Sequence, residues 1–335
     1  MSDESLVSVI LLTFNSSKYI GRALSSVYAQ NYQNLEVIVV DAGSCDQTKN
    51  IVSSFAGVMW LDLPDSDMGM ARNHGLNHSN GEYVMFLDSD DLYLEGKIDN
   101  QIKALEENKA LDFVVSQAYV MKGYGKKIGI KDWTFDKLNL DSFLYGQCYS
   151  LATLCIRKQS LTQNCRFYEH DAGRYCEDWS FQFRLLLEGL TFDVLPCTSV
   201  LVELRNDSHT HWSIQPKMKA VGLSVVESAI ATIKAQGIKC HSNKQDVIDN
   251  YKFKLAISYF ANGLLSSGRG TLSLISGNFL AQRAILIPMS FILPTLLFSS
   301  CLRYLWSKQQ RSTFQWTTMS TSMSEWIDEH NKHLN

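Results

Sequence analysis

The sequence predicts an α/β fold: a mainly parallel sheet flanked by helices, with a helical C-terminal extension. Over the first ~105 residues, short apolar and β-branched runs alternate with segments whose apolar residues recur every three or four positions, and this alternation is typical of parallel strands joined by helical crossovers. After about residue 212 the pattern is helical only. These two observations define the fold class.

Strands and helices alternate in order through the first part of the chain. Leu6–Leu12 is an apolar run short enough for a buried strand, and the apolar residues of Lys18–Gln30 repeat at helical spacing. Ser44 and Gln47 have the spacing of a capping box, so a helix is expected to follow them. The other elements expected here are strands at 35–40, 58–61 and 82–87 and helices at 44–55, 70–77 and 94–107.

The pattern becomes less regular after residue 107. A loop is expected at 123–140, where neither period is sustained. The other expected elements are strands at 112–121, 150–156 and 198–204 and helices at 177–188, 220–236 and 244–265.

Composition and charge exclude several classes of protein. The chain has 335 residues, of which 45% are hydrophobic and 19% charged, so it is expected to fold rather than to be disordered. Its net charge is −3, which gives no basic excess for generic nucleic-acid binding. Eight cysteines are scattered without a C-x-x-C pair, and Met1–Ser5 lacks the positive charge of a secretory signal. Both features favour a reducing, cytoplasmic location.

Polar residues follow three of the predicted strands. They are Thr13–Asn15, Asp41–Ser44 and Asp88–Asp91. Because ligands of open parallel sheets bind outside the carboxyl ends of the strands, these segments predict one shared polar site. The alternative interpretation is that such residues only form turns and cap helices, and for Asp41–Ser44 taken alone that alternative is the better one.

The acidic cluster after the third strand indicates a metal site. Asp88, Asp90 and Asp91 place three carboxylates within four residues, and such close like charges raise each other's pKa. A divalent cation removes this repulsion, and oxygen ligands suit Mg²⁺ or Mn²⁺. We therefore expect Asp88 and Asp90, a D-x-D pair, to be metal ligands.

Two further segments carry candidate functional groups. Arg72, in the segment DMGMARN, offers a planar fork that suits phosphate or carboxylate, although it could equally be a surface arginine. Glu177 and Asp178 open a predicted helix, where a carboxylate can act as a plain cap or as a general base.

The order and spacing of these motifs resemble the family 2 glycosyltransferases, which have the GT-A fold. The resemblance is carried by VSVILLTFN (7–15), EVIVVDAGSCDQT (36–48), DMGMARNHGL (67–76), GEYVMFLDSDD (81–91) and CEDWSFQFRLL (176–186). It covers residues 6–212 and leaves out the C-terminal third.

This resemblance implies an inverting, hexosyl-type glycosyltransferase. Such an enzyme moves a sugar from a nucleotide-diphosphate donor, here expected to be a UDP-sugar, to a hydroxyl of a glycan or lipid-linked acceptor in polysaccharide biosynthesis. It also implies a division of the part that it covers: residues 1–105 form the nucleotide-sugar-binding half and residues 106–212 the acceptor-binding half of the same domain. Residues 213–335, which it does not cover, are expected from their own pattern to form a helical C-terminal region that could attach to a membrane.

The resemblance implies donor-binding roles for the strand ends. Phe14 stands where the family places an aromatic ring against the nucleotide base, with Thr13 and Asn15 beside it. Asp41 matches an acid that is linked to base recognition, although Ala42 stands where many members have a second Asp.

The remaining roles concern the reaction itself. Arg72 matches an element near the diphosphate, Asp88 and Asp90 match the D-x-D metal site, and Asp178 matches the proposed catalytic base. Residues 203–209 look like a degenerate form of the family's closing segment, in which His209 or His211 could approach the metal, or both could be solvated loop residues.

Two other functions compete with this interpretation. A sugar nucleotidyltransferase would favour a glycine-rich, basic loop after the first strand, and Thr13–Ser17 has no glycine. A non-catalytic sugar-nucleotide-binding or scaffold protein of a polysaccharide assembly complex would not need an intact D-x-D together with Asp178. Slow release of nucleoside diphosphate without acceptor would distinguish the enzyme from the scaffold.

An uncharged run near the C-terminus raises the question of membrane attachment. Residues 284–302 lie between Arg283 and Arg303, with Trp306 nearby, and the run is close to the ~20 residues of a spanning helix. Its two prolines are tolerated in membranes. The segment could span the bilayer, lie in its cytoplasmic interface or pack within a helical bundle, and the interfacial alternative is the one we expect.

Overall fold

The computed structural model describes residues 4–122, 129–133, 138–146, 149–204, 215–276 and 317–318. The chain divides into two compact units. The first, the sheet unit, comprises Met1–Asn139, Gln147–Arg205 and Trp316–Asn335, and the second, the helical unit, comprises Leu140–Gly146 and Asn206–Gln315. The assignment of residues 1–105 and 106–212 to donor and acceptor halves stays a prediction.

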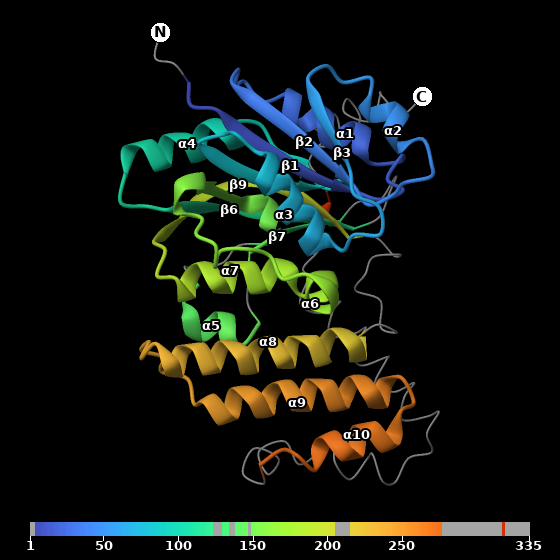
Figure 1. Ribbon diagram of the computed structural model, residues 1–335, viewed down its shortest axis with the longest axis vertical. Coiled ribbons are helices and arrows are strands. Elements are labelled where there is room, and N and C mark those ends of the chain that lie inside the picture. Colours follow the sequence, from blue (N-terminus) through green and yellow to red (C-terminus); the bar gives the residue numbers. More distant parts are fainter. Residues whose placement is uncertain are drawn as a thin grey trace. The chain divides into compact units, whose positions relative to one another are not determined.

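A ten-stranded mixed sheet forms the centre of the sheet unit (Figure 1). Its strands run in the order β10-β7-β6-β8-β4-β1-β2-β3, and β9 pairs with both β5 and β6. β1 pairs in parallel with β2 and β4, and β2 pairs in parallel with β3, whereas β8 is antiparallel to β4 and β6. The strands are β1 (Val7–Thr13), β2 (Leu35–Asp41), β3 (Val58–Asp62), β4 (Tyr83–Asp88), β5 (Leu92–Tyr93), β6 (Phe113–Lys122), β7 (Gly129–Trp133), β8 (Leu154–Arg157), β9 (Phe192–Leu204) and β10 (Thr317–Thr318).

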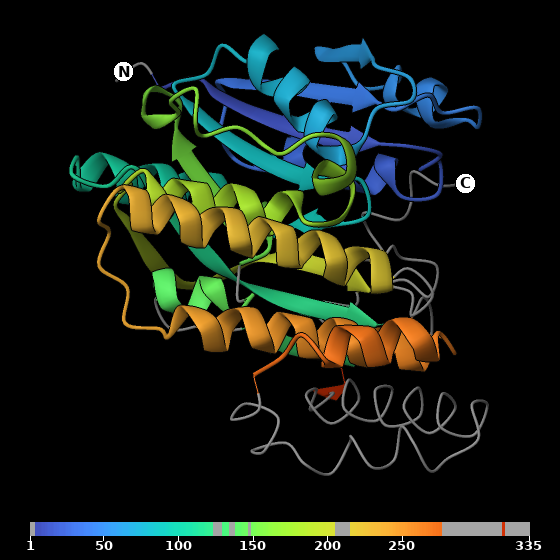
Figure 2. The same cartoon turned by 60° about the horizontal axis from the view of Figure 1, so that its bottom comes forward.

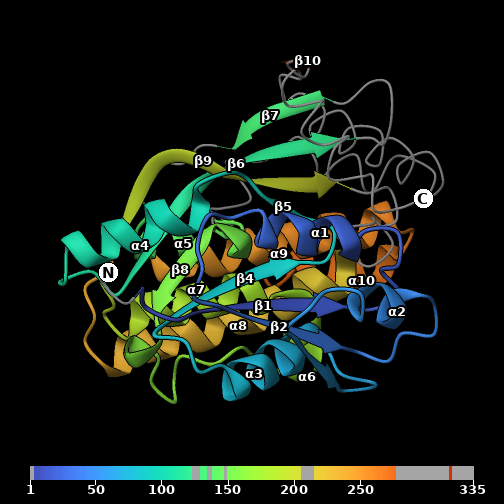
Figure 3. The ribbon, with the colours of Figure 1, turned by 90° about the horizontal axis from the view of Figure 1, so that it is seen from above.

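Helices cover both faces of this sheet (Figure 3). Alternate residues of β1 point to opposite faces, so Val9 joins the core beneath α1 and α4, whereas Ile10 packs against Gly75 of α3. Phe86 of β4 lies on the same face as Ile10 and packs edge-on against Phe181 of α7. The helices of this unit are α1 (Ile20–Tyr28), α2 (Thr48–Val52), α3 (Met68–His78), α4 (Lys97–Glu107), α6 (His170–Tyr175) and α7 (Glu177–Leu187), with 3₁₀ turns at Leu151–Thr153 and Lys158–Ser160.

The α/β class with a mostly parallel sheet is therefore confirmed, and three local expectations are wrong. The expected loop at 123–140 contains β7, because Gly129–Trp133 pairs with β6. The strand expected at 150–156 begins with a 3₁₀ turn and becomes extended only at Leu154. Ser44 does not cap α2, which begins at Thr48, because its hydroxyl donates to Asp41 instead.

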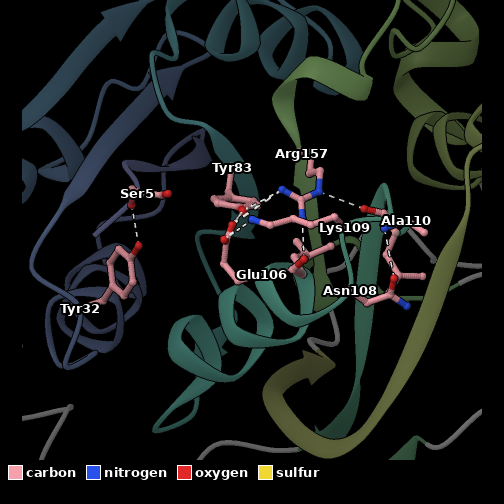
Figure 4. A network of polar contacts seen from close by, with 10 residues as sticks. Ser5, Tyr32, Tyr83, Glu106, Asn108, Lys109, Ala110 and Arg157 are labelled. Carbon is pink, nitrogen blue, oxygen red and sulfur yellow. Dashed lines mark hydrogen bonds and ion pairs between the residues drawn. The ribbon is translucent and has the colours of Figure 1, made fainter. Parts of the chain in front are cut away.

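A buried arginine fastens the end of α4 to the sheet (Figure 4). Arg157 of β8 is 4% exposed, and it donates to the Tyr83 hydroxyl at 2.8 Å and to the Leu111 carbonyl at 3.0 Å. Tyr83 in turn donates to Glu106 near the end of α4. A buried guanidinium needs such partners, so this network fixes the scaffold around β4.

The helical unit contains α5 (Leu140–Leu144), α8 (Gln215–Ala235), α9 (Lys244–Ala261) and α10 (Leu265–Leu272). α8 and α9 pack as an antiparallel pair, and α10 packs on α9 (Figure 1, Figure 2). Asp141 of α5 accepts from the Ser242 amide at 2.6 Å and the Cys240 thiol at 3.0 Å. Although burial raises the pKa of Asp141, these hydrogen bonds lower it to about 2.

None of the described helices is both long enough and apolar enough to cross a bilayer. The uncharged run at 284–302 lies outside the described residues, and so do Trp306, His209 and His211.

Candidate active site

The strand register brings the predicted polar segments to one edge of the sheet. Thr13, the last residue of β1, pairs with Asp41, the last residue of β2, and Leu12 pairs with Asp88 at the end of β4. Asp41 pairs in turn with Asp62 at the end of β3. The three segments therefore start from neighbouring positions, as the sequence predicts.

The loop after β1 holds an aromatic ring in solvent. Phe14 is 60% exposed, which is unusual for a phenylalanine, whereas Thr13 is buried. Asn15 has a φ of 47°; its amide donates to the Ser44 hydroxyl at 2.8 Å, and its side-chain oxygen accepts from the Cys45 amide at 2.9 Å. These contacts tie the loop to the one after β2 and fix the backbone that carries Phe14.

Thr13 and Asp41 differ in how their oxygens are used. The Thr13 hydroxyl is buried and has no hydrogen-bond partner within the described residues, which is costly in a folded protein unless a ligand or water completes it. Asp41 is also buried, but it accepts from the Gly43 and Ser44 amides at 3.1 and 2.8 Å. Asp41 thus shapes its own turn, as in the simpler interpretation of its segment, and its role in base recognition stays a prediction.

Arg72 links the edge of the sheet to the start of α7. Its guanidinium donates to Asp88 Oδ1 at 2.8 Å and to Glu177 Oε1 at 2.6 Å, and its side chain is 3% exposed. Its Nε has no partner among the described residues. Burial lowers the pKa of Arg72, but Asp88 and Glu177 more than offset this and raise it. The arginine expected near the diphosphate therefore contacts two carboxylates.

Glu177 and Asp178, the acid pair at the start of α7, are buried, and burial disfavours their charged forms. Burial raises the pKa of Glu177 to about 7, with Arg72 opposing the shift and Asp178 adding to it. Burial also raises the pKa of Asp178, again against Arg72, while Oδ1 of Asp178 accepts from the Trp179 amide at 2.6 Å. A carboxylate with a raised pKa is a stronger proton acceptor than an ordinary one.

The acidic cluster after β4 shows the predicted repulsion. Asp91 is buried, and its pKa is raised well above the ordinary value by burial and then by Asp90 and Asp88. Asp91 Oδ1 accepts from the Glu203 amide at 3.0 Å, so this acid anchors β9, and Asp90 is partly buried in the turn.

Asp88, one of the two predicted metal ligands, is accessible to solvent at the end of β4. The Asp88 side chain is 48% exposed and its oxygens are hard ligands, but the described residues include no group of three or more Asp, Glu, His or Cys placed to hold a metal. Binding of Mg²⁺ or Mn²⁺ by Asp88 and Asp90 therefore stays a prediction.

Sequence reasoning missed a set of contacts that α3 and its N-cap make with the start of α6 and the segment before it. Asp67 accepts from the Met70 amide at 2.8 Å as a helix cap and from the His170 amide at 2.5 Å. Asn73 exchanges hydrogen bonds with the Phe167 backbone at 2.9 and 3.0 Å and donates to Glu169 at 2.9 Å. The available signal was the gathering of Asp, Arg and Asn on one short helix.

A second buried ion pair lies at the far end of β9. Arg22 of α1 pairs with Glu203, and both side chains are almost fully buried. Glu203 belongs to the degenerate closing segment of the sequence, and its structural partner is an arginine of the core; the residues after it, 205–214, lie outside the described range.

Part of the chain is similar to known glycosyltransferases. Residues 8–162 match the model described as "Glycosyl transferase family 2". A glycosyltransferase of Rickettsia typhi is 32% identical over 187 residues, covering 54% of this chain and 58% of its own length. The poly(ribitol-phosphate) beta-N-acetylglucosaminyltransferase TarP of Staphylococcus aureus is 28% identical over 201 residues, covering 56% and 59%. The chain thus spans about three fifths of these relatives.

Solved structures show the same fold at low identity. S. aureus TarS 1–349 in complex with UDP-GlcNAc aligns with a TM-score of 0.54 and 20% identity, covering 80% of this chain and 88% of that one. The mannosyltransferase PcManGT of Pyrobaculum calidifontis, in complex with GDP-Man and Mn²⁺, aligns with a TM-score of 0.54 and 14% identity, covering 93% and 88%. Glu177 and Asp178 lie beyond the matched residues 8–162, so their roles stay predictions that rest on the motif, although Glu177 does pair with Arg72.

Proposed function

Because residues 8–162 form a glycosyl transferase family 2 domain, we propose that the chain is an inverting glycosyltransferase that uses a nucleotide-diphosphate sugar. The observation that carries this proposal is the Arg72 ion-pair bridge. It joins an acid at the donor edge of the sheet to the acid pair that opens α7, and Asp178 of that pair has the raised pKa of a general base.

The donor binds at the ends of β1 and β2 in this proposal. Phe14 stacks on the base, since its exposed ring is held on a fixed loop, and Thr13 and Asn15 complete the pocket. Asp41 shapes the adjoining turn and borders the base. UDP is the nucleotide we favour, because the solved TarS structure contains UDP-GlcNAc.

Asp88 and Asp90 would hold Mg²⁺ or Mn²⁺ together with the donor's diphosphate. Such a cation, when bound, neutralises the charge that develops on the departing diphosphate. The carboxylate repulsion around Asp91 supports this assignment, and so does the Mn²⁺ in the PcManGT structure.

Asp178 is the proposed base. It accepts the proton of the acceptor hydroxyl while that oxygen forms a bond to the anomeric carbon. The bond from this carbon to the phosphate oxygen breaks, and the nucleoside diphosphate leaves with the electron pair. Attack opposite the leaving group inverts the anomeric centre, which requires a base away from the metal-binding acids. A hydroxyl of a glycan or of a lipid-linked acceptor is the expected acceptor. The name of the relative TarP gives poly(ribitol-phosphate), another hydroxyl-bearing polymer, as the acceptor of that enzyme.

Nucleoside diphosphate release tests the proposal. The full-length protein is incubated with UDP-, GDP- and dTDP-sugars in Mn²⁺ or Mg²⁺, without acceptor, and the freed diphosphate is quantified. We expect slow, cation-dependent release from one donor. Binding of a donor without any release, with or without candidate acceptors, would favour the scaffold alternative. Conversion of the donor and added pyrophosphate into a nucleoside triphosphate and a sugar 1-phosphate would favour the nucleotidyltransferase.

We also propose that residues 284–302 attach the protein to the cytoplasmic face of a membrane, which would suit a lipid-linked acceptor. The support is the uncharged run bordered by Arg283 and Arg303. Sedimentation with liposomes tests it: the full chain should co-sediment, and a variant with Ile292→Asp and Leu297→Asp should remain in the supernatant. Equal sedimentation of both would contradict the attachment.

A further inference from the structure

Arg72 is shared by two carboxylates that serve different parts of the site. Asp88 ends β4 at the donor edge, and Glu177 opens the helix of the proposed base. Arg72 contacts Asp88 at 2.8 Å and Glu177 at 2.6 Å from its two terminal nitrogens. The guanidinium is almost fully buried, and both carboxylates are held by the same single positive charge.

The two carboxylates that contact Arg72 differ in their exposure to solvent. Glu177 is buried with its side chain 6% exposed, whereas the Asp88 side chain is 48% exposed. Asp88 is therefore the partner that an external cation can reach. A cation at Asp88 and the guanidinium of Arg72 draw on the same carboxylate, so a stronger hold by Arg72 must weaken binding of the cation.

We propose that Glu177 is a positioning residue that acts through Arg72 to set the affinity of Asp88 for the donor's cation. Because Glu177 also pairs with Arg72, the guanidinium attracts Asp88 less strongly. The Asp88 carboxylate then remains available to a divalent cation bound to a nucleoside diphosphate. This inference rests on the proposed function and deepens it. It also assigns Arg72 to coupling the donor edge to α7 rather than to holding phosphate.

The coupling works in both directions, because linkage between two sites is reciprocal. When Asp88 binds a cation, its attraction to Arg72 weakens. Arg72 then stabilises the charged forms of Glu177, with which it pairs, and of Asp178, whose pKa it lowers electrostatically. Occupancy of the donor edge thereby stabilises the charged acid pair on α7. The helix that carries the proposed base is then held in place when a donor is present.

Calorimetric titration of Mn²⁺ with UDP tests the proposal without relying on activity. Glu177→Gln removes the charge but keeps the shape, and Arg72 keeps Asp88 as a partner. In mildly alkaline buffer, where Glu177 is charged in the wild type, we expect the variant to bind Mn²⁺ and UDP roughly 5- to 10-fold more weakly, at the lower end of typical coupling between sites.

Glu169→Gln is the matched control. Glu169 is an acid of the neighbouring segment that also contacts α3, but through Asn73 rather than Arg72. The same loss of charge there should leave the affinity unchanged. Glu177→Asp provides a second variant, because it keeps the charge but withdraws the carboxylate from Arg72, and its affinity should fall in the same direction as that of Glu177→Gln.

Each outcome decides between specific alternatives. Wild-type affinity in both Glu177 variants would overturn the coupling but leave the proposed function standing. An equal loss in Glu169→Gln would show a general charge effect and overturn it as well. Failure of both Glu177 variants to fold, judged by circular dichroism, would make Glu177 a residue of the fold alone. If the wild type binds none of UDP, GDP and dTDP in the presence of Mn²⁺, the proposed function is contradicted together with this inference.

Discussion

Asp178→Asn should lower the rate of sugar transfer without lowering the stability of the protein. The amide keeps the side-chain oxygen that accepts from the Trp179 amide, so the start of α7 retains its local hydrogen bond. It removes a carboxylate that burial makes unfavourable in its charged form. Loss of the base should lower transfer by about 10²–10⁴-fold, equivalent to about 3–5 kcal/mol of transition-state stabilisation, while the melting temperature stays the same or rises.

The pH dependence has a definite sign. Because the folded pKa of Asp178 is raised, its contribution to stability is fully present below its unfolded pKa and is lost as pH rises through the folded pKa. Transfer shows the reverse trend, since a base must be deprotonated: the wild-type rate should fall as pH drops through this pKa. Asp178→Asn should lose that acidic limb and keep whatever residual rate remains.

The assay combines transfer kinetics, thermal denaturation and UDP binding. Glu188→Gln is the control, because it makes the same charge change at the opposite end of α7, where Glu188 accepts from Asn164 at 3.1 Å. The control should transfer sugar at the wild-type rate. The reasoning would be refuted by an Asp178→Asn variant with near-normal transfer, or by one whose loss of activity accompanies a lower melting temperature.

Three further changes probe the donor edge, the core and α3. Phe14→Ala should weaken UDP binding by about 1–2 kcal/mol, as loss of base stacking does, without changing the melting temperature; unaltered calorimetric affinity would contradict the stacking role. Lys97→Met should raise the melting temperature near neutral pH by a few degrees. Burial lowers the pKa of Lys97 to about 8, so keeping the charged lysine in the folded state costs about 3 kcal/mol. The variant also loses the hydrogen bond to Gln101, which offsets part of the gain. The gain should shrink between pH 8 and the ordinary lysine pKa, and a pH-independent gain would point to packing instead. Asn73→Ala should cost roughly 2–3 kcal/mol of stability through its contacts with residues 167–169 and lower the transfer rate more than UDP affinity; a loss of UDP affinity of the same size would count against this.

The first two strands of the sheet were predictable because burial on both faces requires a continuous run of apolar residues. Residues 7–13 and 35–41 are strands buried on both faces, and such strands read as continuous β-branched runs. β9 was predicted only from residue 198, whereas it begins at Phe192. Pro196 interrupts the pattern there, and the strand continues through it because the register with β6 shifts between Val115 and Gln117.

The site was predictable only in its separate parts. Polar residues at strand ends can be read from the chain, since parallel strands align their carboxyl ends. Which partner each charge would find depends on the packing of α3 and α7, and Arg72 meets Glu177 across 105 positions of sequence. No local pattern records that contact. The chemistry of Arg72 suits phosphate and carboxylate alike, the resemblance places it near the diphosphate, and its two carboxylate partners are visible only in the fold.

Gly75 shows how the packing of α3 sets the position of Arg72. A glycine inside a helix costs about 1 kcal/mol relative to alanine, and this cost is offset at a position where no side chain would fit. A Cβ at Gly75 would lie 2.5 Å from Ile10 of β1, which means that α3 approaches the sheet more closely than any other residue would permit. Arg72 lies three residues earlier, on the same face of the helix. The close approach at Gly75 therefore holds α3 where Arg72 can reach Asp88. The geometry of the proposed site thus depends on Gly75, although this residue contacts none of the charged groups.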